Sequence, residues 1–214
     1  MALNNLQVGP QVVSDGSQPV ARAGKSGETS VSDAHARYME PNYRGLCFSL
    51  DSDAVTAAAA NATKGALATV KLVNGFANPQ GGTKLAVITA ITTATTSGTP
   101  GGPLFYNFLG GISVTSAATG TIRSNYLGGS STSGMLPQVN VVVTVSGGAT
   151  TALTQLGVHG GPAAIAAGAG LYGFTDYIDG KIIVGPGCVF GLTVVAAGTS
   201  HVIQSTIYWE EIPI

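Results

Sequence analysis

The sequence predicts an all-β protein, a jelly-roll-like β-sandwich that follows an extended N-terminal arm. From Gly45 onward the chain consists of short runs rich in β-branched and aromatic residues, and Gly, Pro or Asn separates one run from the next. Segments with a helical pattern are scarce after the arm, and the chain shows no repeat of the length that propellers and solenoids use. Many short strands joined by tight turns favour a sandwich of jelly-roll type.

Two parts are expected, an anchoring arm over residues 1–44 and the β-sandwich domain over residues 45–214. The arm is rich in charged residues, and its apolar residues show no sustained period. A segment of this composition cannot bury enough apolar surface to fold alone, so we expect it to become ordered on a partner. Within the arm, Ser32–Met39 favours a short helix that Pro41 would end.

The domain is expected to contain a series of short strands. Two of them alternate clearly: in residues 138–145 the odd-numbered valines would face one way, and in His201–Trp209 the even-numbered residues would oppose the odd-numbered ones. The predicted strands are Leu46–Leu50, Ala68–Val73, Lys84–Thr95, Phe105–Phe108, Ile112–Thr115, Gly120–Tyr126, Gln138–Ser146, Thr154–His159, Lys181–Val184, Val189–Ala196 and His201–Ile212.

Between these strands, two segments have an unusual composition. Asp53–Thr63 is rich in alanine and favours either a helix or an extended loop. Gly160–Gly173 is too rich in glycine for a stable helix, so it predicts a long apolar loop. An exposed apolar loop is costly to leave in water, and we expect this one to meet a neighbour.

Charge is nearly absent from the middle of the chain. Between Leu85 and Thr175 the only charged residue is Arg123, and charged residues make up 9% of the whole chain, against about 25% in a typical soluble domain. The formal net charge is −1, so we expect neither nucleic acid nor an anionic membrane as a partner. This composition argues against an ordinary enzyme and for a structural protein that packs and assembles.

Membrane insertion and secretion are not expected either. The chain has no uninterrupted apolar run of about 18 residues. Its N-terminus lacks the basic and apolar regions of a signal peptide. We therefore expect synthesis and assembly in a cytoplasm.

The residues that could support catalysis are few and scattered. His35, His159 and His201 stand in no spacing typical of a nucleophile or a metal site. No phosphate-binding or dinucleotide-binding glycine motif is present, so we expect no catalytic residue, no cofactor and no metal. Cys47 and Cys188 are expected to be buried, reduced thiols.

The sequence also predicts roles for three further groups of residues. Asp176 and Asp179, with Tyr172 and Tyr177, could form a rim that binds a sugar, because aromatic rings stack on sugars and carboxylates bond hydroxyls. Of Glu210 and Glu211, alternation sends one inward, where a basic residue of the arm would pair with it. Trp209 is expected either in the core or as an anchor between subunits.

The two ends of the chain resemble virion proteins of tailed bacteriophages. The segment SGETSVSDAHARYMEPNYRGLCFS (Ser26–Ser49) is similar to the junction of arm and domain in a group of phage structural proteins. The segment HVIQSTIYWEEIPI (His201–Ile214) is similar to the closing strand of their trimeric jelly-roll domain. The resemblance implies a homotrimer that decorates or cements a capsid, or forms a fibre, with the arm gripping the particle and no catalytic residue.

The resulting expectation is a phage virion protein that decorates and stabilises the capsid and binds the major capsid protein or another virion protein. The alternative is a receptor-binding tail or fibre protein that recognises a host glycan through the sugar-binding rim; an enzyme such as a polysaccharide depolymerase is disfavoured by the scarcity of charge. The residues expected to bind the partner are Arg22, Lys25, Glu28, Arg37, Tyr38 and Arg44, and those expected at the trimer interface are Arg123, Trp209 and Glu210.

Overall fold

The computed structural model describes the chain in eight stretches. They are residues 38–56, 69–97, 104–109, 118–128, 131–144, 154–159, 172–194 and 202–214. The chain divides into two compact units, Met1–Glu40 and Pro41–Ile214. Of the first unit only residues 38–40 are described, so the extended arm stays a prediction. All the described strands belong to the second unit.

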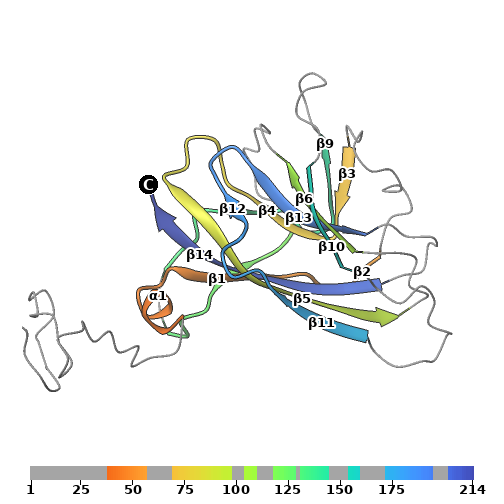
Figure 1. Ribbon diagram of the computed structural model, residues 1–214, viewed down its shortest axis with the longest axis horizontal. Coiled ribbons are helices and arrows are strands. Elements are labelled where there is room, and N and C mark those ends of the chain that lie inside the picture. The colour runs from red at the N-terminus through yellow and green to blue at the C-terminus, as the bar shows by residue number, and fades with distance from the viewer. Residues whose placement is uncertain are drawn as a thin grey trace, which may run out of the picture. The chain divides into compact units, whose positions relative to one another are not determined.

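The described strands of the second unit form two antiparallel sheets and a two-stranded ribbon (Figure 1). In the first sheet the strand order is β11 (Tyr172–Tyr177), β5 (Lys84–Ser97), β14 (Val202–Pro213), β1 (Cys47–Asp51) and β7 (Ile122–Ser124), and the short strands β12 (Ile183–Val184) and β2 (Val55–Thr56) pair with β5 and β14. In the second sheet the order is β10 (Thr154–His159), β6 (Leu104–Leu109), β13 (Val189–Val194), β4 (Asn74–Ala77) and β8 (Leu136–Pro137). A separate ribbon pairs β3 (Thr69–Leu72) with β9 (Val141–Thr144).

The strand order is that of a jelly roll. The chain places β1, β5, β11 and β14 in the first sheet, and β4, β6, β10 and β13 in the second. The row β1–β14–β5–β11 therefore faces the row β4–β13–β6–β10, and the chain crosses between the two sheets as in a double Greek key. This confirms the predicted fold class, an all-β sandwich of jelly-roll type.

The long excursion between β6 and β10 adds one strand to each sheet. Its strand β7 pairs with β1, and its strand β8 pairs with β4. Both added strands lie on the same side of the sandwich, where β1 and β4 would otherwise be edge strands. Covering a strand edge satisfies its backbone groups and removes a site of uncontrolled pairing.

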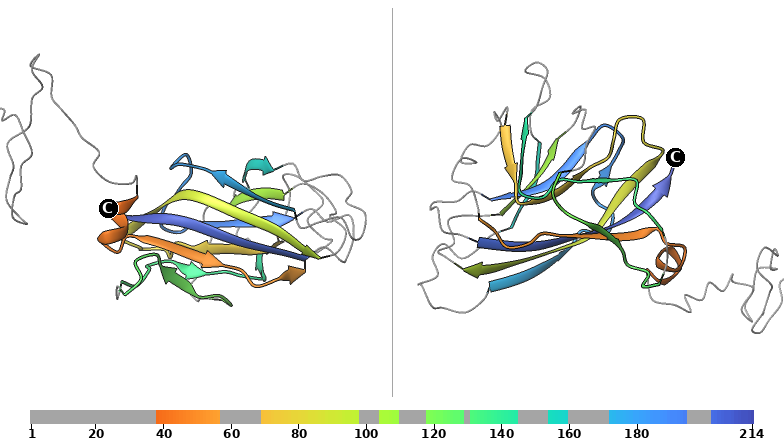
Figure 2. Two further views of the ribbon diagram at one scale, coloured as in Figure 1. Left: turned by 90° about the horizontal axis from the view of Figure 1, so that it is seen from below. Right: turned by 180° about the vertical axis from the view of Figure 1, so that it is seen from behind.

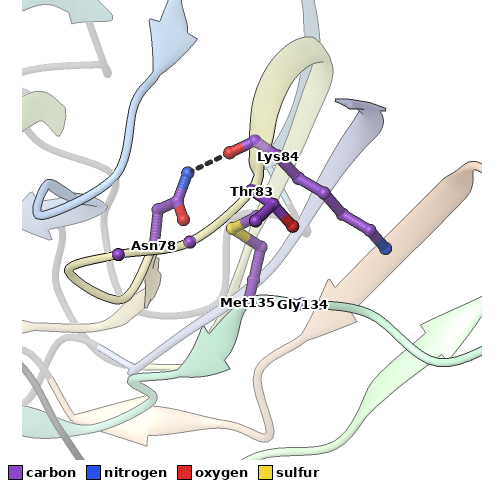
Figure 3. Close-up of a pocket in the computed structure, with 7 residues that line it drawn as sticks. Asn78, Thr83, Lys84, Gly134 and Met135 are labelled. Atoms are coloured by element: carbon purple, nitrogen blue, oxygen red, sulfur yellow. Dashed lines mark hydrogen bonds between the residues drawn. The ribbon is translucent and has the colours of Figure 1, made fainter. Parts of the chain in front are cut away.

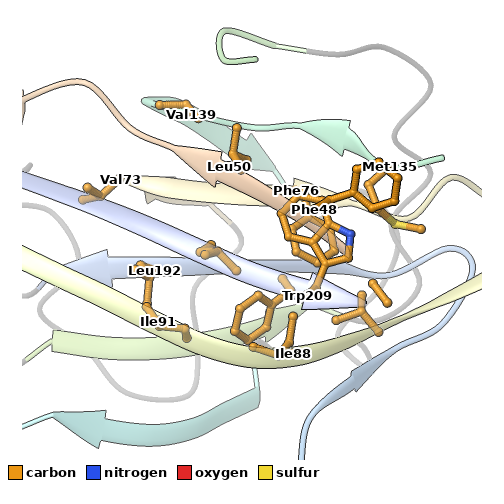
Figure 4. Packing of buried hydrophobic residues seen from close by; sticks show 14 of the residues in the cluster. Phe48, Leu50, Val73, Phe76, Ile88, Ile91, Met135, Val139, Leu192 and Trp209 are labelled. Carbon is orange, nitrogen blue, oxygen red and sulfur yellow. The ribbon is translucent and has the colours of Figure 1, made fainter. Parts of the chain in front are cut away.

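The core lies between the sheets and centres on aromatic rings (Figure 4). Trp209 of β14 is fully buried, and its ring centroid is 4.6 Å from that of Phe76 in β4 and 6.2 Å from that of Phe48 in β1. Phe190 of β13 packs on Phe76 from within the second sheet, with centroids 6.0 Å apart. Pairs at these distances add to the free energy gained by burying large rings. Of the two environments expected for Trp209, the core and an interface between subunits, the structure shows the core.

Alternation along β14 follows the prediction. Ile203, Ser205, Ile207 and Trp209 are buried, whereas the residues between them are exposed or half-buried. The prediction for residues 138–145 fails at its start, because Gln138 and Val139 are both buried. Asn140 explains the failure, since its φ of +52° turns the chain before β9 begins.

Other local predictions were wrong for identifiable reasons. Among the described residues one short helix is present, α1 (Met39–Tyr43), which contains Pro41 instead of ending before it, and residues 32–37 of the predicted helix lie outside the described residues. Proline is tolerated in a first helical turn, where its missing N–H would have no partner. Of the two alternatives for Asp53–Thr63, a helix that starts at Asp53 is excluded because residues 55–56 form β2, and residues 57–63 lie outside the described residues. The predicted loop over residues 160–173 ends in β11, and the rest of that loop and the strand Ile112–Thr115 lie outside the described residues.

Candidate interaction surface

The two sheets differ in how their outer faces are covered. On the second sheet, the outward residues Val189, Gly191 and Thr193 are buried. Leu72 of β3 is fully buried there, because the paired glycines Gly75 and Gly191 leave room for its side chain. On the first sheet, outward residues such as Thr175 and Gln204 are exposed. This open face, formed by β11, β5, β14, β1 and β7, is the surface available to a partner (Figure 2, left).

Strand register places the open-face residues in rows, because residues directly opposite each other project to the same side of a sheet. One row, the tyrosine row, runs across all five strands as Tyr177, Ala90, Tyr208, Ser49 and Arg123. The adjacent threonine row runs as Thr175, Thr92, Thr206 and Asp51.

The charges of these two rows lie at one end. Asp51 and Arg123 are on β1 and β7, and the seven other residues of the rows are uncharged. The carboxylate of Asp51 accepts a hydrogen bond of 2.8 Å from the hydroxyl of Thr206. Within the two rows, the part built by β11, β5 and β14 therefore presents hydroxyls, two phenol rings and methyl groups, and Glu210, the next outward residue of β14 after Tyr208, lies outside the rows on the same face.

Four aliphatic side chains lie together at another part of the same face. Ile183 pairs with Val87, and Ile212 pairs with Leu85, on the three neighbouring strands β12, β5 and β14. Ile183 is 53% exposed and Ile212 is 40% exposed. We name this group, Leu85, Val87, Ile183 and Ile212, the aliphatic patch. Contiguous exposed apolar side chains are typical of surfaces that bind another protein.

A buried carboxylate lies on the inner side of the same strands. The side chain of Glu211 is fully buried, and its oxygens accept hydrogen bonds from Lys84 Nζ at 2.7 Å, from the Ser133 hydroxyl, and from the Gly134 amide at 3.1 and 3.2 Å. The indole N–H of Trp209 donates to the same carboxylate at 3.3 Å. Every donor is supplied by the chain itself, so this Glu211 cluster is a structural anchor for residues 131–135.

A shallow pocket of about 190 Å³ lies beside the anchor (Figure 3). It is lined by Asn78, Gly81, Gly82, Thr83, Lys84, Gly134 and Met135. Asn78 is 1% exposed, and its amide nitrogen donates to the carbonyls of Lys84 and Val184 at 2.8 and 3.0 Å. The lining contains no histidine, cysteine or carboxylate, and its amine, Lys84 Nζ, is paired with Glu211. The two hydrogen bonds of Asn78 hold the turn between β4 and β5 against β12, which contains Val184.

Of the residues expected to bind a partner, most cannot be placed. Arg22, Lys25, Glu28 and Arg37 lie outside the described residues. Arg44 is exposed directly after α1, and Tyr38 is half-buried directly before it. The arm interface therefore stays a prediction.

The three residues expected at a trimer interface lie in different environments. Arg123 is exposed on β7 at the end of the tyrosine row. Glu210 is half-buried on the open face, opposite Cys47 of β1. Trp209 is fully buried within its own chain, so its ring is not available to a neighbouring subunit. The inward glutamate of the pair is Glu211, and it pairs with Lys84 instead of with a basic residue of the arm.

The four residues of the predicted sugar-binding rim do not form one surface. Asp176 lies opposite Ile91 and projects toward the inner side, whereas Tyr177 lies opposite Ala90 and projects onto the open face. Asp179 is in the following turn with a φ of +51°. Tyr172 pairs with Thr95 at the far end of β11, about 17 Å along the strand from Tyr177. Only Tyr177, which is 69% exposed, lies on the open face.

Sequence reasoning missed the residues that accompany Tyr177. Tyr208, Thr92 and Thr206 share its face only because three strands distant in sequence pair in this register. The even-numbered alternation of β14 identified Tyr208 and Thr206 as one side of a strand. No signal in the sequence predicted that β11 and β5 would extend that side.

The two cysteines are free thiols, Cys47 buried and Cys188 half-buried. Burial, and to a lesser degree the nearby charge of Glu210, raises the pKa of the Cys47 thiol to about 11. A thiol with this pKa is unreactive at neutral pH. Within the described stretches no group of three or more His, Cys, Asp or Glu side chains could hold a metal ion.

Comparison with known proteins gives no family. No protein-family profile and no curated protein matches the chain. A solved structure of infectious bursal disease virus, Gt strain, matches with 16% identity over 96% of this chain and 47% of that chain, at a TM-score of 0.16. The VP2 subviral particle of infectious bursal disease virus matches with 15% identity over 78% of this chain and 42% of that chain, also at 0.16. This chain thus spans less than half the length of either, and at this TM-score neither likeness carries weight.

Among the described residues, no helix has the length and apolar character needed to cross a membrane.

Proposed function

We propose that this protein is a virion structural protein, a jelly-roll subunit that decorates and stabilises a capsid as a homotrimer. The arm, residues 1–44, would anchor each subunit to the major capsid protein or another virion protein. The observation that carries the proposal is the aliphatic patch on the open face of the first sheet. No catalysis is assigned to the chain.

The patch suits contact between copies of the chain. Its four side chains are uncharged and lie on paired strands, and Glu210, which pairs with Val87, borders them. A second copy can bury the aliphatic side chains at little electrostatic cost when this carboxylate stays in water at the rim or pairs with a cation. Aliphatic surface contributes about 25 cal/mol for each Å² removed from water. The similarity of His201–Ile214 to the closing strand of trimeric phage domains also supports a cyclic assembly, because Ile212 of the patch lies in that segment.

Light scattering coupled to size-exclusion chromatography tests the trimer with the full chain. The expected mass is three times the 21.3 kDa of one chain. Ile183→Asp should lower this mass, because it places a charge in the patch. Leu127→Asp is the matched control, since Leu127 is 91% exposed outside the patch. A wild-type monomer, or equal effects of both substitutions, would contradict the proposal.

A deletion tests the arm. Removing residues 1–37 leaves α1 in place, with the hydrogen bond of 2.9 Å from the Leu46 amide to the Pro41 carbonyl that follows it. The truncated chain should keep the trimer mass and lose binding to the particles that carry the protein. Binding of the truncated chain at full occupancy would overturn the anchoring role.

The second candidate is a receptor-binding fibre protein, and the exposed Tyr177 is the observation that favours it. Copy number separates the two, because a decoration protein covers the whole capsid and a fibre occupies few positions. Quantitative mass spectrometry of purified virions measures this number directly. A count comparable to that of the major capsid protein favours decoration, and a count far below it favours the fibre.

A further inference from the structure

The tyrosine and threonine rows have a chemistry that differs from that of the aliphatic patch. They bring two phenol rings and a line of hydroxyls together on one face of a sheet, with Asp51 and Arg123 at one end of the rows and Glu210 next to Tyr208 on β14. We propose that these two rows form a platform that binds a neutral, linear glycan chain. This inference is independent of the proposed role in the virion. Of the four residues of the predicted sugar-binding rim, the two rows contain only Tyr177.

The first step is the spacing of the two tyrosines. Tyr177 and Tyr208 both pair with Ala90, from opposite sides of β5. Two strand spacings separate their backbones, about 9.6 Å, which is comparable to two successive sugar units of a linear glycan. The small side chain of Ala90 stands between the two tyrosines in the row. A sugar ring can place its C–H face on each tyrosine, while the glycan backbone crosses Ala90.

The second step is the line of hydroxyls beside the rings. Thr175 and Thr206 both pair with Thr92, so three hydroxyl-bearing residues stand on adjacent strands next to the tyrosine row. Each hydroxyl can donate one hydrogen bond and accept two. The hydroxyl of Thr206 donates to Asp51 at 2.8 Å, which leaves its oxygen free to accept from a ligand. A sugar that stacks on Tyr208 would have its own hydroxyls within reach of this line.

The charges around the rows restrict the class of ligand that can bind. The rows carry Asp51 and Arg123 at the β1 and β7 end, and Glu210 lies next to Tyr208 on the same face, so Arg123 is the one cation that the rows offer. An anionic polysaccharide or a nucleic acid needs several cations to hold its charges. A neutral glycan needs none, and it matches a surface of hydroxyls and rings. Charge complementarity thus selects a neutral, polyhydroxylated ligand.

The residues of the platform stand on a rigid part of the fold. Tyrosine loses little conformational entropy when it binds, because it has only two side-chain torsions. Both rings, and the threonines beside them, stand on the paired central and edge strands of one sheet. A binding surface on such strands keeps its geometry better than one on loops. The platform is therefore set before the ligand arrives, as a weak ligand such as a glycan requires.

The test uses the full-length chain and affinity electrophoresis in gels that contain soluble neutral polysaccharides, namely hydroxyethyl cellulose, xylan and galactomannan, with an array of neutral bacterial oligosaccharides alongside. At least one of these probes should retard or capture the wild type. Tyr177→Ala should weaken that binding about tenfold, since loss of one stacked ring removes roughly 1.4 kcal/mol. Thr92→Val, which removes a hydroxyl at constant shape, should weaken it a few-fold.

The control for exposure and residue type is Tyr43→Ala. Tyr43 is 69% exposed, as Tyr177 is, but it lies in α1 and packs on Tyr126 with ring centroids 5.9 Å apart. This variant should bind like the wild type. Thermal unfolding of each variant confirms that a loss of binding is not a loss of fold.

Three outcomes would overturn the platform. The wild type could bind no neutral probe, or Tyr43→Ala could lose as much affinity as Tyr177→Ala. In the third outcome, Tyr177→Ala and Thr92→Val would lower the oligomer mass in light scattering without changing glycan binding. That result would assign the rows to contact between copies of the chain, and it would leave the decoration role standing.

Discussion

Lys84 and Glu211 form a salt bridge of 2.7 Å that joins the neighbouring strands β5 and β14 at the margin of the core. The carboxylate is fully buried, whereas the lysine side chain is 32% exposed. The same carboxylate accepts hydrogen bonds from Ser133 and Gly134. The buried carboxylate of Glu211 therefore connects β14, the last strand of the sandwich, to Ser133 and Gly134 in the segment between β6 and β10.

Removing this carboxylate should destabilise the protein strongly. Glu211→Ala leaves the Lys84 ammonium, the Gly134 amide and the Trp209 indole without their acceptor. Breaking a buried ion pair from one side costs about 3–5 kcal/mol. Urea unfolding followed by tryptophan fluorescence measures the loss, and Glu210→Ala is the control, because its side chain lies on the open face outside this network. Equal losses for the two variants would show that the cluster is not an anchor.

Gly75→Ala should destabilise the second sheet. A Cβ at this position would lie 2.6 Å from the Phe190 carbonyl oxygen and 2.9 Å from the Gly191 Cα. Both are backbone atoms that cannot move without shifting β13, and overpacking of this kind costs about 1–3 kcal/mol. Gly185→Ala is the matched control, since the only atom near its Cβ is Leu85 Cδ2 at 4.0 Å. Thermal and urea unfolding of both variants compare the costs.

Asn78→Asp should destabilise the β4–β5 turn. Its amide nitrogen donates to the Lys84 and Val184 carbonyls, and a carboxylate would place an acceptor opposite both of them. The loss should be about 2 kcal/mol or more, because two buried acceptors lose their donor. Asn140→Asp, an exposed residue with a φ of +52° that aspartate also adopts, should change the unfolding free energy little. A smaller effect at residue 78 than at residue 140 would refute this role of Asn78.

The Cys47 thiol should make stability fall at high pH. Its pKa is raised from 9.0 to about 11 in the folded chain, by burial first and by Glu210 second. The unfolded thiol loses its proton at lower pH than the folded one, so this contribution is complete below pH 9 and disappears as pH rises toward 11. Unfolding free energies measured from pH 8 to pH 11 should fall less steeply for Cys47→Ala than for the wild type. Identical slopes would contradict the raised pKa.

Much of the fold could be predicted because it depends on local pattern. Alternation in His201–Trp209 identified the two faces of β14, since every second residue of a strand projects to the same side. The run Thr154–His159 agrees with β10 at both ends. Strand β4 was missed because Asn74 and Gly75 are poor strand formers. There the register with β13 and the packing of Leu72 on two glycines outweigh local preference.

The candidate surface was predicted less well, for a physical reason. Tyr177 was identified from its own sequence neighbours, Asp176 and Asp179, but in a strand adjacent residues project to opposite faces. Its real neighbours on the open face are Ala90 and Tyr208, which lie on two other strands. Likewise the partner of the inward glutamate is Lys84, on the neighbouring strand β5, not a residue of the arm.

The sequence by itself determined that this chain is a charge-poor β-sandwich, because hydrophobic alternation, turn residues and composition act over a few neighbouring positions. Only the tertiary structure decided which face of which sheet is left open and which side chains meet there. Those outcomes depend on the register between strands far apart in the chain. Register follows from the packing of the whole core around Trp209 and Phe76, and no short segment contains that information.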